Sequence, residues 1–305
     1  MAAGDERRAG GAAGASAMAR ALKGAPVARA LTEELARRAA VLREAGCAPT
    51  LALVRVGERP DDLAYERGIL SRCEKVGISV RPVELAKGVS QGELEAALLA
   101  LDADAAVHGI LLFRPLPAGL DEAAAAACVS AAKDVDCMGA AGLLAILSGQ
   151  GTGFAPCTAE AVVALLDHYG VVLDGARVAV VGRSLVIGRP VAALLLARNA
   201  TVTTCHTHTA DLAAACREAD VIVAAAGHAA TVGAACVRAG QTIVDVGMNV
   251  DVSTGALVGD VDAEAVAPVV GGLTPVPGGV GAVTTAILAR HVIEAAERAL
   301  EAPAL

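Results

Sequence analysis

The sequence predicts an α/β protein of two α/β domains, the C-terminal one with a Rossmann-like parallel sheet. Short runs of β-branched residues alternate with helix-like stretches along most of the chain, which is typical of strands joined by crossover helices. A length of 305 residues exceeds the usual size of one domain, so two domains are expected. The expected strands near residues 182, 206, 226 and 247 end together, and open α/β sheets bind ligands in the crevice at such ends.

The N-terminal half is expected to alternate helices with short apolar strands. Leu31, Leu35 and Leu42 lie among charged residues, which indicates an amphipathic helix that Pro49 closes. Gly77 is expected to cap the second helix. The expected helices are residues 27–44, 61–76 and 91–101, the strands are residues 51–57, 78–83 and 107–113, and a helix-rich linker spans residues 121–147.

The C-terminal half repeats this alternation. Strands are expected at residues 177–181, 201–205, 221–226 and 241–247, and helices at residues 159–169, 191–198, 212–218 and 284–300. The stretch 274–281, which precedes the last helix, is too rich in proline and glycine to be regular.

One turn between an expected strand and an expected helix is a candidate phosphate site. The strand breaks at Gly182, and the loop reads Gly-Arg-Ser-x-x-x-Gly-x-Pro up to Pro190, a residue that suits a first helical turn. Backbone N–H groups in such a turn approach a phosphate, and the helix N-terminus adds partial positive charge. The alternative is an ordinary turn between a strand and a helix, as any α/β domain contains.

Composition limits the class of partner and the compartment. A formal net charge of −8 leaves no basic surplus for phosphates, so no nucleic-acid partner is expected. The eight cysteines include no Cys-x-x-Cys pair, so we expect no metal site and reduced thiols in a cytoplasmic protein. No stretch is apolar enough to predict a membrane span. Residues 1–17 lack the apolar core of a signal peptide and are interpreted as a disordered extension before Met18.

Many short motifs in a fixed order carry a family resemblance. They are Val56-Gly57 with Tyr65 eight residues further on, His108-Gly109-Ile110-Leu111, Pro115-Leu116-Pro117, Lys133-Asp134-Val135-Asp136, Pro156-Cys157-Thr158, Gly182-Arg183-Ser184, residues 203–209, Asp245-Val246-Gly247-Met248-Asn249, Gly259-Asp260-Val261 and residues 274–281. From Met18 onward the chain resembles the bifunctional methylenetetrahydrofolate dehydrogenase/methenyltetrahydrofolate cyclohydrolase (FolD) family.

The resemblance implies one cleft, between the two domains, that serves two reactions. Family members oxidise 5,10-methylenetetrahydrofolate with NADP, or sometimes NAD, and then hydrolyse the methenyl product to 10-formyltetrahydrofolate. The implied partners are therefore tetrahydrofolate derivatives in one-carbon metabolism and, for most members, a second copy of the chain. The implied domains are a folate-binding catalytic domain at residues 18–147 and an NAD(P)-binding domain at residues 148–283, with residues 284–305 returning to the first domain.

The resemblance also assigns site residues. Tyr65 matches the tyrosine that stacks on or orients the pterin. Asp136 matches the aspartate that accepts hydrogen bonds from the pterin, as suits a carboxylate that faces N–H donors. A packing role for Tyr65 and a helix-capping or surface role for Asp136 are the alternatives. The other expected site residues are Pro277, Gly278 and Gly279 for the substrate, and Gly182, Arg183, Ser184, Gly188, Thr207 and Met248 for the cofactor.

The sequence favours NADP over NAD as the cofactor. Arg183 directly follows the glycine at the strand end, where a guanidinium reaches a 2′-phosphate, and Thr207 offers a hydroxyl at the end of the next strand. No acidic residue stands at that strand end to hold the ribose hydroxyls of NAD.

Departures from the family pattern fall mainly on the substrate side. Ile69 stands where the family has the lysine of the cyclohydrolase step, and Phe113 stands where it has the glutamine that tunes this lysine. Arg114 takes the place of a leucine, and Cys137 takes the place of a glycine. Isoleucine has no proton to exchange, so general acid–base catalysis loses its usual residue, whereas hydride transfer depends mainly on positioning.

We therefore expect an NADP-dependent methylenetetrahydrofolate dehydrogenase with weak or absent cyclohydrolase activity. Two alternatives remain open: a fully bifunctional enzyme in which Arg114 or His108 takes over the missing charge, and a degenerate paralogue that acts as a binding subunit. Arg114 is a poor base because guanidinium stays protonated, although it is a candidate contact for the acidic tail of the folate. His108 is usual in the family and is expected to be structural.

Overall fold

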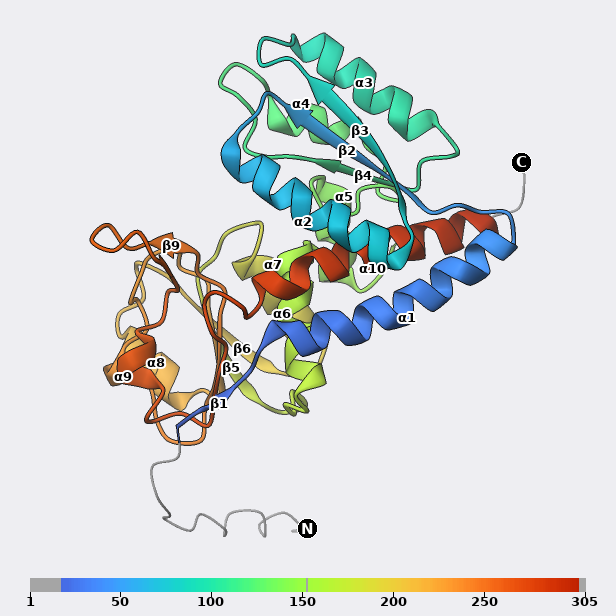
Figure 1. The fold of residues 1–305 in the computed structure, drawn as a ribbon. Coiled ribbons are helices and arrows are strands. Elements are labelled where there is room, and N and C mark those ends of the chain that lie inside the picture. The colour runs from blue at the N-terminus through green and yellow to red at the C-terminus, as the bar shows by residue number, and fades with distance from the viewer. Residues whose placement is uncertain (1–17, 152, 302–305) are drawn as a thin grey trace.

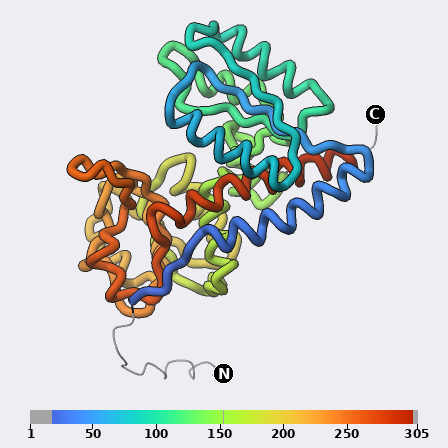
Figure 2. Tube along the Cα trace, viewed as in Figure 1, coloured from blue at the N-terminus to red at the C-terminus, as the bar shows by residue number. Residues whose placement is uncertain are grey.

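The structure is a computed structural model that describes residues 18–151 and 153–301. Figures 1 and 2 show two lobes, along which run two long helices, α1 (Gly24–Glu44) and α10 (Gly281–Glu301). The mixed α/β architecture predicted from the sequence is confirmed. Residues 1–17, which were expected to form a disordered extension, lie outside the described residues.

The N-terminal lobe contains a three-stranded parallel sheet in the order β3-β2-β4. Its strands are β2 (Thr50–Val56), β3 (Ser79–Leu85) and β4 (Gly109–Leu112), and its helices are α2 (Pro60–Val76), α3 (Gln91–Ala103) and α4 (Glu122–Ala127). The central strand β2 is buried on both faces except at its first residue, as its apolar sequence requires. Gly77 ends α2 in a left-handed conformation with φ of 87°, which confirms the expected cap.

The C-terminal lobe contains a six-stranded parallel sheet in the order β1-β11-β8-β7-β5-β6. Its longer strands are β5 (Arg177–Val181), β6 (Thr201–Cys205), β7 (Val221–Ala224) and β8 (Thr242–Asp245), and its helices are α6 (Cys157–His168), α7 (Gly188–Leu196), α8 (Leu212–Glu218) and α9 (Ala263–Val266). A short antiparallel hairpin, β9 (Asn249–Val250) and β10 (Leu257–Val258), projects from it (Figure 1).

Two strands of this sheet were not predicted. They are β1 (Arg20–Ala21) and β11 (Gly272–Leu273), which pair with each other in parallel. The backbone N–H of Arg20 donates to Gly271 and that of Leu22 donates to Leu273, so the start of the chain extends the sheet of the second lobe. Strands of two residues are too short to show an alternating pattern in the sequence.

The last helix joins the two lobes. The α10 helix packs against α1 and α2 and also against α6 at the start of the second lobe. It begins at Gly281, three residues before the expected start, since the last residue of the glycine-rich stretch 274–281 is already helical. Arg38 of α1 forms an ion pair with Glu297 of α10, with N–O distances of 2.9 and 2.6 Å.

Burial of α1 against the rest of the core predicts a large effect at Leu35, whose side chain is 0% exposed. Replacing Leu35 by alanine is expected to lower the free energy of unfolding by about 2–5 kcal/mol, because it removes apolar contacts and leaves a cavity. Urea unfolding followed by circular dichroism measures this. Val41→Ala on the same helix is the matched control, since Val41 is 65% exposed and its loss is expected to change stability by less than about 0.5 kcal/mol. Equal losses in both variants would contradict the described packing of α1.

Candidate active site

A cavity of about 650 Å³ lies between the two lobes. The first lobe contributes Tyr65 of α2, and the segment that leads to α6 contributes Asp136 and Pro156. The second lobe contributes residues 245–248 after β8 and residues 275–282 before and at the start of α10. The expected site residues that line this cavity together are Tyr65, Asp136, Met248, Pro277, Gly278 and Gly279.

A smaller cavity of about 400 Å³ adjoins the first one. Tyr65, Asp136 and Val186 line both cavities, so the two are neighbours around the same residues. Phe113 and Arg114 lie on the wall of the smaller cavity. Its remaining lining residues are Asp62, Leu111, Leu112, Pro115 and Glu122.

Asp136 is held at the boundary between the two cavities. Its Oδ1 atom accepts a hydrogen bond from the backbone N–H of Cys157 at 3.1 Å. Its Oδ2 atom lies 4.0 Å from Nη2 of Arg114, and both side chains are 25% exposed. The carboxylate is therefore fixed through one oxygen and balanced by a cation near the other, with part of its surface open to the cavity.

Tyr65 lines the same two cavities as Asp136. Its ring meets Phe113 edge to face, with ring centroids 6.1 Å apart and an interplanar angle of 82°. Burial, together with the nearby Cys157 and Asp136, raises the pKa of the Tyr65 hydroxyl well above its usual value. Tyr65 is therefore a neutral hydrogen-bond donor at physiological pH, with its ring orientation set by Phe113.

The two departures that remove polar groups have different surroundings. Ile69 is 1% exposed and belongs to the same buried cluster as Val283 and Ile287, so it lies beneath the cavity and not on its wall. Phe113 lies on the wall of the smaller cavity. Of these two departures, only Phe113 borders a cavity, whereas the buried face of α2 turns the side chain of Ile69 into the core.

Two further sequence observations have a direct structural basis. Cys137 has φ of 55°, a left-handed conformation that glycine adopts more readily, which accounts for a glycine at this position in the family pattern. His108 lines neither cavity. Its Nδ1 atom accepts the backbone N–H of Thr50 at 3.2 Å, and its Nε2 atom lies 3.4 Å from Sγ of Cys47.

The turn between β5 and α7 depends on two glycines. Gly182 has φ of 131°, and a Cβ atom there would lie 2.0 Å from the carbonyl oxygen of Ala225. A Cβ atom on Gly188 would lie 2.3 Å from the carbonyl oxygen of Gly182. No other residue fits at either position, so the turn brings the start of α7 directly against the end of β5.

Ser184 binds backbone amides in the turn before α7, which the sequence did not predict. Its hydroxyl oxygen accepts the backbone N–H of Ile187 at 3.1 Å and that of Gly188 at 3.4 Å. These two amides therefore have a partner within the protein, in the turn that leads into α7. Val186 and Ile187 of this turn line the main cavity, whereas Gly182, Arg183, Ser184 and Gly188 do not.

Arg183 and Thr207 are exposed at the neighbouring ends of β5 and β6. The two ends are joined by a hydrogen bond from the N–H of Gly182 to the carbonyl of Cys205 at 2.9 Å. Desolvation lowers the pKa of His206, and the positive charges of Arg183 and His208 lower it further. Arg183 is therefore the permanent cation at this end of the sheet, where the sequence predicted the 2′-phosphate contact.

Two buried aspartates, of which Asp245 lines the main cavity, were not assigned a role from the sequence. Asp245 lies at the end of β8, where its carboxylate accepts the backbone N–H groups of Gly247, Asp260 and Val261 at 2.8–3.0 Å. Asp260 in turn accepts the N–H of Gly227 at 2.8 Å. Burial raises the pKa of Asp245, and the three N–H donors counteract the rise.

The glycines beside these aspartates follow from the same contacts. A Cβ atom on Gly247 would lie 2.3 Å from Asp260, and one on Gly259 would lie 1.8 Å from the Asp245 carboxylate. The sequence contains the motifs around Asp245 and Asp260, but it does not predict the hydrogen bonds that join the loops at residues 227, 245–247 and 260.

Comparison with known proteins shows which family the chain resembles. Residues 22–136 match the family described as "Tetrahydrofolate dehydrogenase/cyclohydrolase, catalytic domain", and residues 156–300 match "Tetrahydrofolate dehydrogenase/cyclohydrolase, NAD(P)-binding domain". The bifunctional protein FolD of Alkaliphilus oremlandii is 46% identical over 278 residues, covering 91% of this chain and 97% of the relative. That of Clostridioides difficile is 47% identical over 274 residues, covering 90% and 95%.

Solved structures agree with the sequence relatives. The FolD enzyme of Campylobacter jejuni superposes with a TM-score of 0.88 at 36% identity, covering 91% of this chain and 98% of that chain. The Trypanosoma brucei FolD, solved in complex with NADP cofactor and an inhibitor, gives a TM-score of 0.87 at 34% identity, covering 94% and 100%. Among the described residues, no helix combines the length and apolarity that crossing a bilayer requires. The fold, the order of the motifs and these matches confirm the resemblance, and the chain belongs to the tetrahydrofolate dehydrogenase/cyclohydrolase (FolD) family.

Proposed function

We propose that this chain is an NADP-dependent methylenetetrahydrofolate dehydrogenase that releases the methenyl product largely unhydrolysed. The observation that carries the proposal is the composition of the cavity walls. Neither lysine nor histidine nor glutamine lines either of the two cavities described above. The walls therefore keep groups that hold a substrate and lack the lysine and glutamine of the family pattern.

The folate side of the proposed site is formed by Tyr65 and Asp136. A main cavity of about 650 Å³ with an adjoining one of about 400 Å³ falls in the usual size range of small-molecule sites. The free oxygen of Asp136 accepts hydrogen bonds from ring N–H and amino groups of a pterin. Tyr65, fixed by Phe113, orients the ring. These contacts hold the methylene carbon in place, which is what hydride transfer requires of the protein.

The cofactor side fits NADP. The glycines at 182 and 188 let the start of α7 pack directly against the end of β5, which is the kind of strand-to-helix turn at which dinucleotides bind. Ser184 remains able to donate its hydroxyl hydrogen, since its oxygen only accepts bonds from the protein amides. Arg183 supplies a cation for a phosphate group. When bound, NADP supplies the oxidant that accepts the hydride.

Hydrolysis needs proton transfer, and the polar groups on the walls are poorly placed for it. Arg114 stays protonated and is not a base. Asp62 is 8% exposed and lies 3.8 Å from Nε of Arg59, while Glu122 accepts the backbone N–H of Leu116 at 2.7 Å. The walls also carry the carboxylates of Asp136 and Asp245, which accept backbone N–H groups, and a retained cyclohydrolase would depend on one of these four acids.

A fully bifunctional enzyme is the second candidate, because the relatives from Alkaliphilus oremlandii and Clostridioides difficile are named bifunctional. A non-catalytic binding subunit is the third, and the intact turn at Gly182 argues against it. We also propose, on the family resemblance, that the protein is a homodimer in the cytoplasm. Light scattering of the purified protein measures its molar mass and so tests the dimer.

The oxidation of methylenetetrahydrofolate is expected to leave methenyltetrahydrofolate in solution. General acid–base assistance contributes about 10²–10⁴-fold, so hydrolysis without it stays near the uncatalysed rate. The near-ultraviolet absorbance of methenyltetrahydrofolate follows its build-up and decay directly. Enzyme-accelerated decay would favour the bifunctional candidate, and the absence of both reactions would favour the binding subunit.

Restoring the two polar groups is expected to restore hydrolysis. The double variant Ile69→Lys with Phe113→Gln should accelerate decay of methenyltetrahydrofolate by at least about tenfold over the parent. Because Ile69 is buried, its lysine is expected to have a lowered pKa, which suits proton transfer near neutral pH. The matched control is Phe113→Gln alone, which opens the smaller cavity without supplying a titratable group. A folded double variant that still oxidises methylenetetrahydrofolate but hydrolyses no faster would contradict this account of the missing activity.

Arg183 is expected to select NADP over NAD. Replacing Arg183 by alanine should weaken NADP binding by about 10- to 100-fold, because a charge-assisted contact to the 2′-phosphate is lost. Binding of NAD, which lacks that phosphate, should change little. Fluorescence titration with both cofactors measures the two affinities. Equal losses for NAD and NADP would show that Arg183 does not contact the 2′-phosphate.

A further inference from the structure

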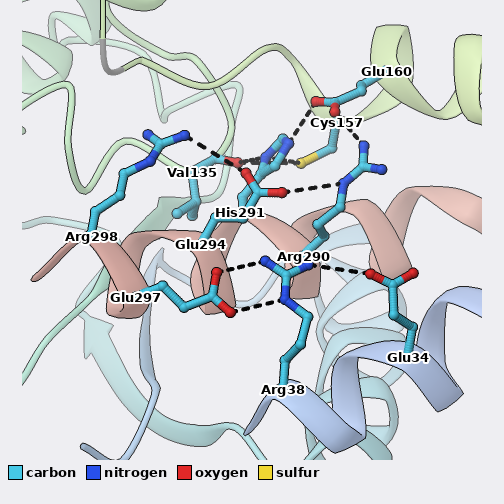
Figure 3. A network of polar contacts seen from close by, with 10 residues as sticks. All are labelled: Glu34, Arg38, Val135, Cys157, Glu160, Arg290, His291, Glu294, Glu297 and Arg298. Atoms are coloured by element: carbon cyan, nitrogen blue, oxygen red, sulfur yellow. Dashed lines mark hydrogen bonds and ion pairs between the residues drawn. The ribbon is translucent and has the colours of Figure 1, made fainter. Parts of the chain in front are cut away.

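A buried polar network surrounds His291 on α10 (Figure 3). His291 is 1% exposed. Its Nδ1 atom lies 2.8 Å from the carbonyl oxygen of Val135, and its Nε2 atom lies 2.6 Å from Oε2 of Glu160. Glu160 also receives a hydrogen bond from Arg290 through its other oxygen. None of these side chains lines the two cavities, so the proposed reaction leaves the network without a role.

The geometry defines the charge state of His291. A carbonyl oxygen and a carboxylate oxygen both accept hydrogen bonds, so both ring nitrogens of His291 must donate and the ring carries a positive charge. Glu160 raises the pKa of His291 against the effect of burial, and the two cations around Glu160 lower its pKa to about 2 despite burial. The ring of Phe154 stacks on His291 at 4.8 Å, which favours a cationic imidazole.

The network reaches Asp136 by two routes, through the residue before it in the chain and through the residue that binds its carboxylate. Val135, whose carbonyl accepts from His291, directly precedes Asp136 in the chain. Cys157, whose backbone N–H donates to Asp136, also places its Sγ atom 3.3 Å from the same carbonyl and 3.7 Å from Nδ1 of His291. Burial raises the pKa of the Cys157 thiol well above its usual value, so the thiol stays protonated and donates to Val135.

We infer that His291 is a positioning residue for Asp136, and that the His291–Glu160 pair sets the affinity of the site for the pterin of the substrate. The inference rests on the proposed function, in which Asp136 accepts hydrogen bonds from that pterin. One charged ring fixes the peptide before Asp136 and, through Cys157, the amide that holds its carboxylate. The cofactor turn belongs to other elements, β5 and α7, so the effect is specific to the folate side.

The His291→Gln variant tests this inference. Glutamine carries no charge and cannot donate to Val135 and Glu160 in the same way as imidazolium. We expect kcat/KM for methylenetetrahydrofolate to fall by about 10- to 100-fold, since small displacements of a binding group cost this much. The KM for NADP is expected to remain unchanged. Ile293→Ala, which removes a buried side chain from the same helix, is the control for loss of stability alone and should leave both KM values unchanged.

A pH profile separates positioning from a merely structural role. As pH rises through the raised pKa of His291, the proton leaves and one of its two hydrogen bonds is lost. The wild type is therefore expected to lose affinity for the folate along an alkaline limb that is absent from His291→Gln. The charged and titratable groups that face His291 are Glu160 and Cys157 on α6 and Arg290 on its own helix, where Glu294 lies 3.9 Å from Arg290.

Calorimetric titration with tetrahydrofolate distinguishes failure of the inference from failure of the proposed function. Weaker binding by His291→Gln than by the wild type and by Ile293→Ala supports the inference, even where turnover is too slow to measure. Equal affinities, or an alkaline limb that persists in His291→Gln, would overturn it and leave the proposed function standing. A folded wild type that neither binds tetrahydrofolate nor reduces NADP would overturn both.

Discussion

The buried ion pair between His291 and Glu160 is the contact on which the segment that carries Asp136 depends. It joins α10, the last helix, to α6, the first helix of the second lobe, beside the segment that carries Asp136. Buried charges are costly unless they are paired, and removing one partner of such a pair typically costs about 3–5 kcal/mol. Here Glu160 has two cationic neighbours, and the second nitrogen of His291 has a carbonyl partner, so the charges are compensated inside the core.

The two proposed reactions make different demands on the site: hydride transfer needs positioning of the substrate, and hydrolysis also needs proton transfer. Tyr65, Asp136 and the glycine turn at 182 supply positioning, and the structure gives each of them a defined partner or a steric reason. Proton transfer requires a titratable group with a suitable pKa on the cavity wall. Phe113 faces the cavity in place of such a group, and Ile69 adds to the core beneath it. These features of the cleft are the basis of the proposed dehydrogenase with little hydrolysis.

Sequence reasoning succeeded where a local pattern is decided by burial alone. The strands at residues 177–181 and 201–205 were predicted with their observed bounds, because parallel strands read as short apolar or β-branched runs between turns. The short strands β1 and β11 escaped prediction, since their pairing is between segments about 250 residues apart. The motifs singled out side chains that line one cavity together, among them Tyr65, Asp136 and Pro277. They did not predict that Asp245 and His291 hold neighbouring loops, because those roles consist of hydrogen bonds between residues distant in sequence.

Nitrogen-15 NMR of His291 in the intact protein tests the central claim, a charged imidazole that holds the segment of Asp136, most directly. We expect both Nδ1 and Nε2 to carry a proton at neutral pH, both protons to be protected from exchange with solvent, and His291 to titrate above its ordinary pKa. We also expect tetrahydrofolate binding to leave this state unchanged. A neutral ring with one protonated nitrogen at neutral pH would contradict the account, because Val135 or Glu160 would then lack its donor.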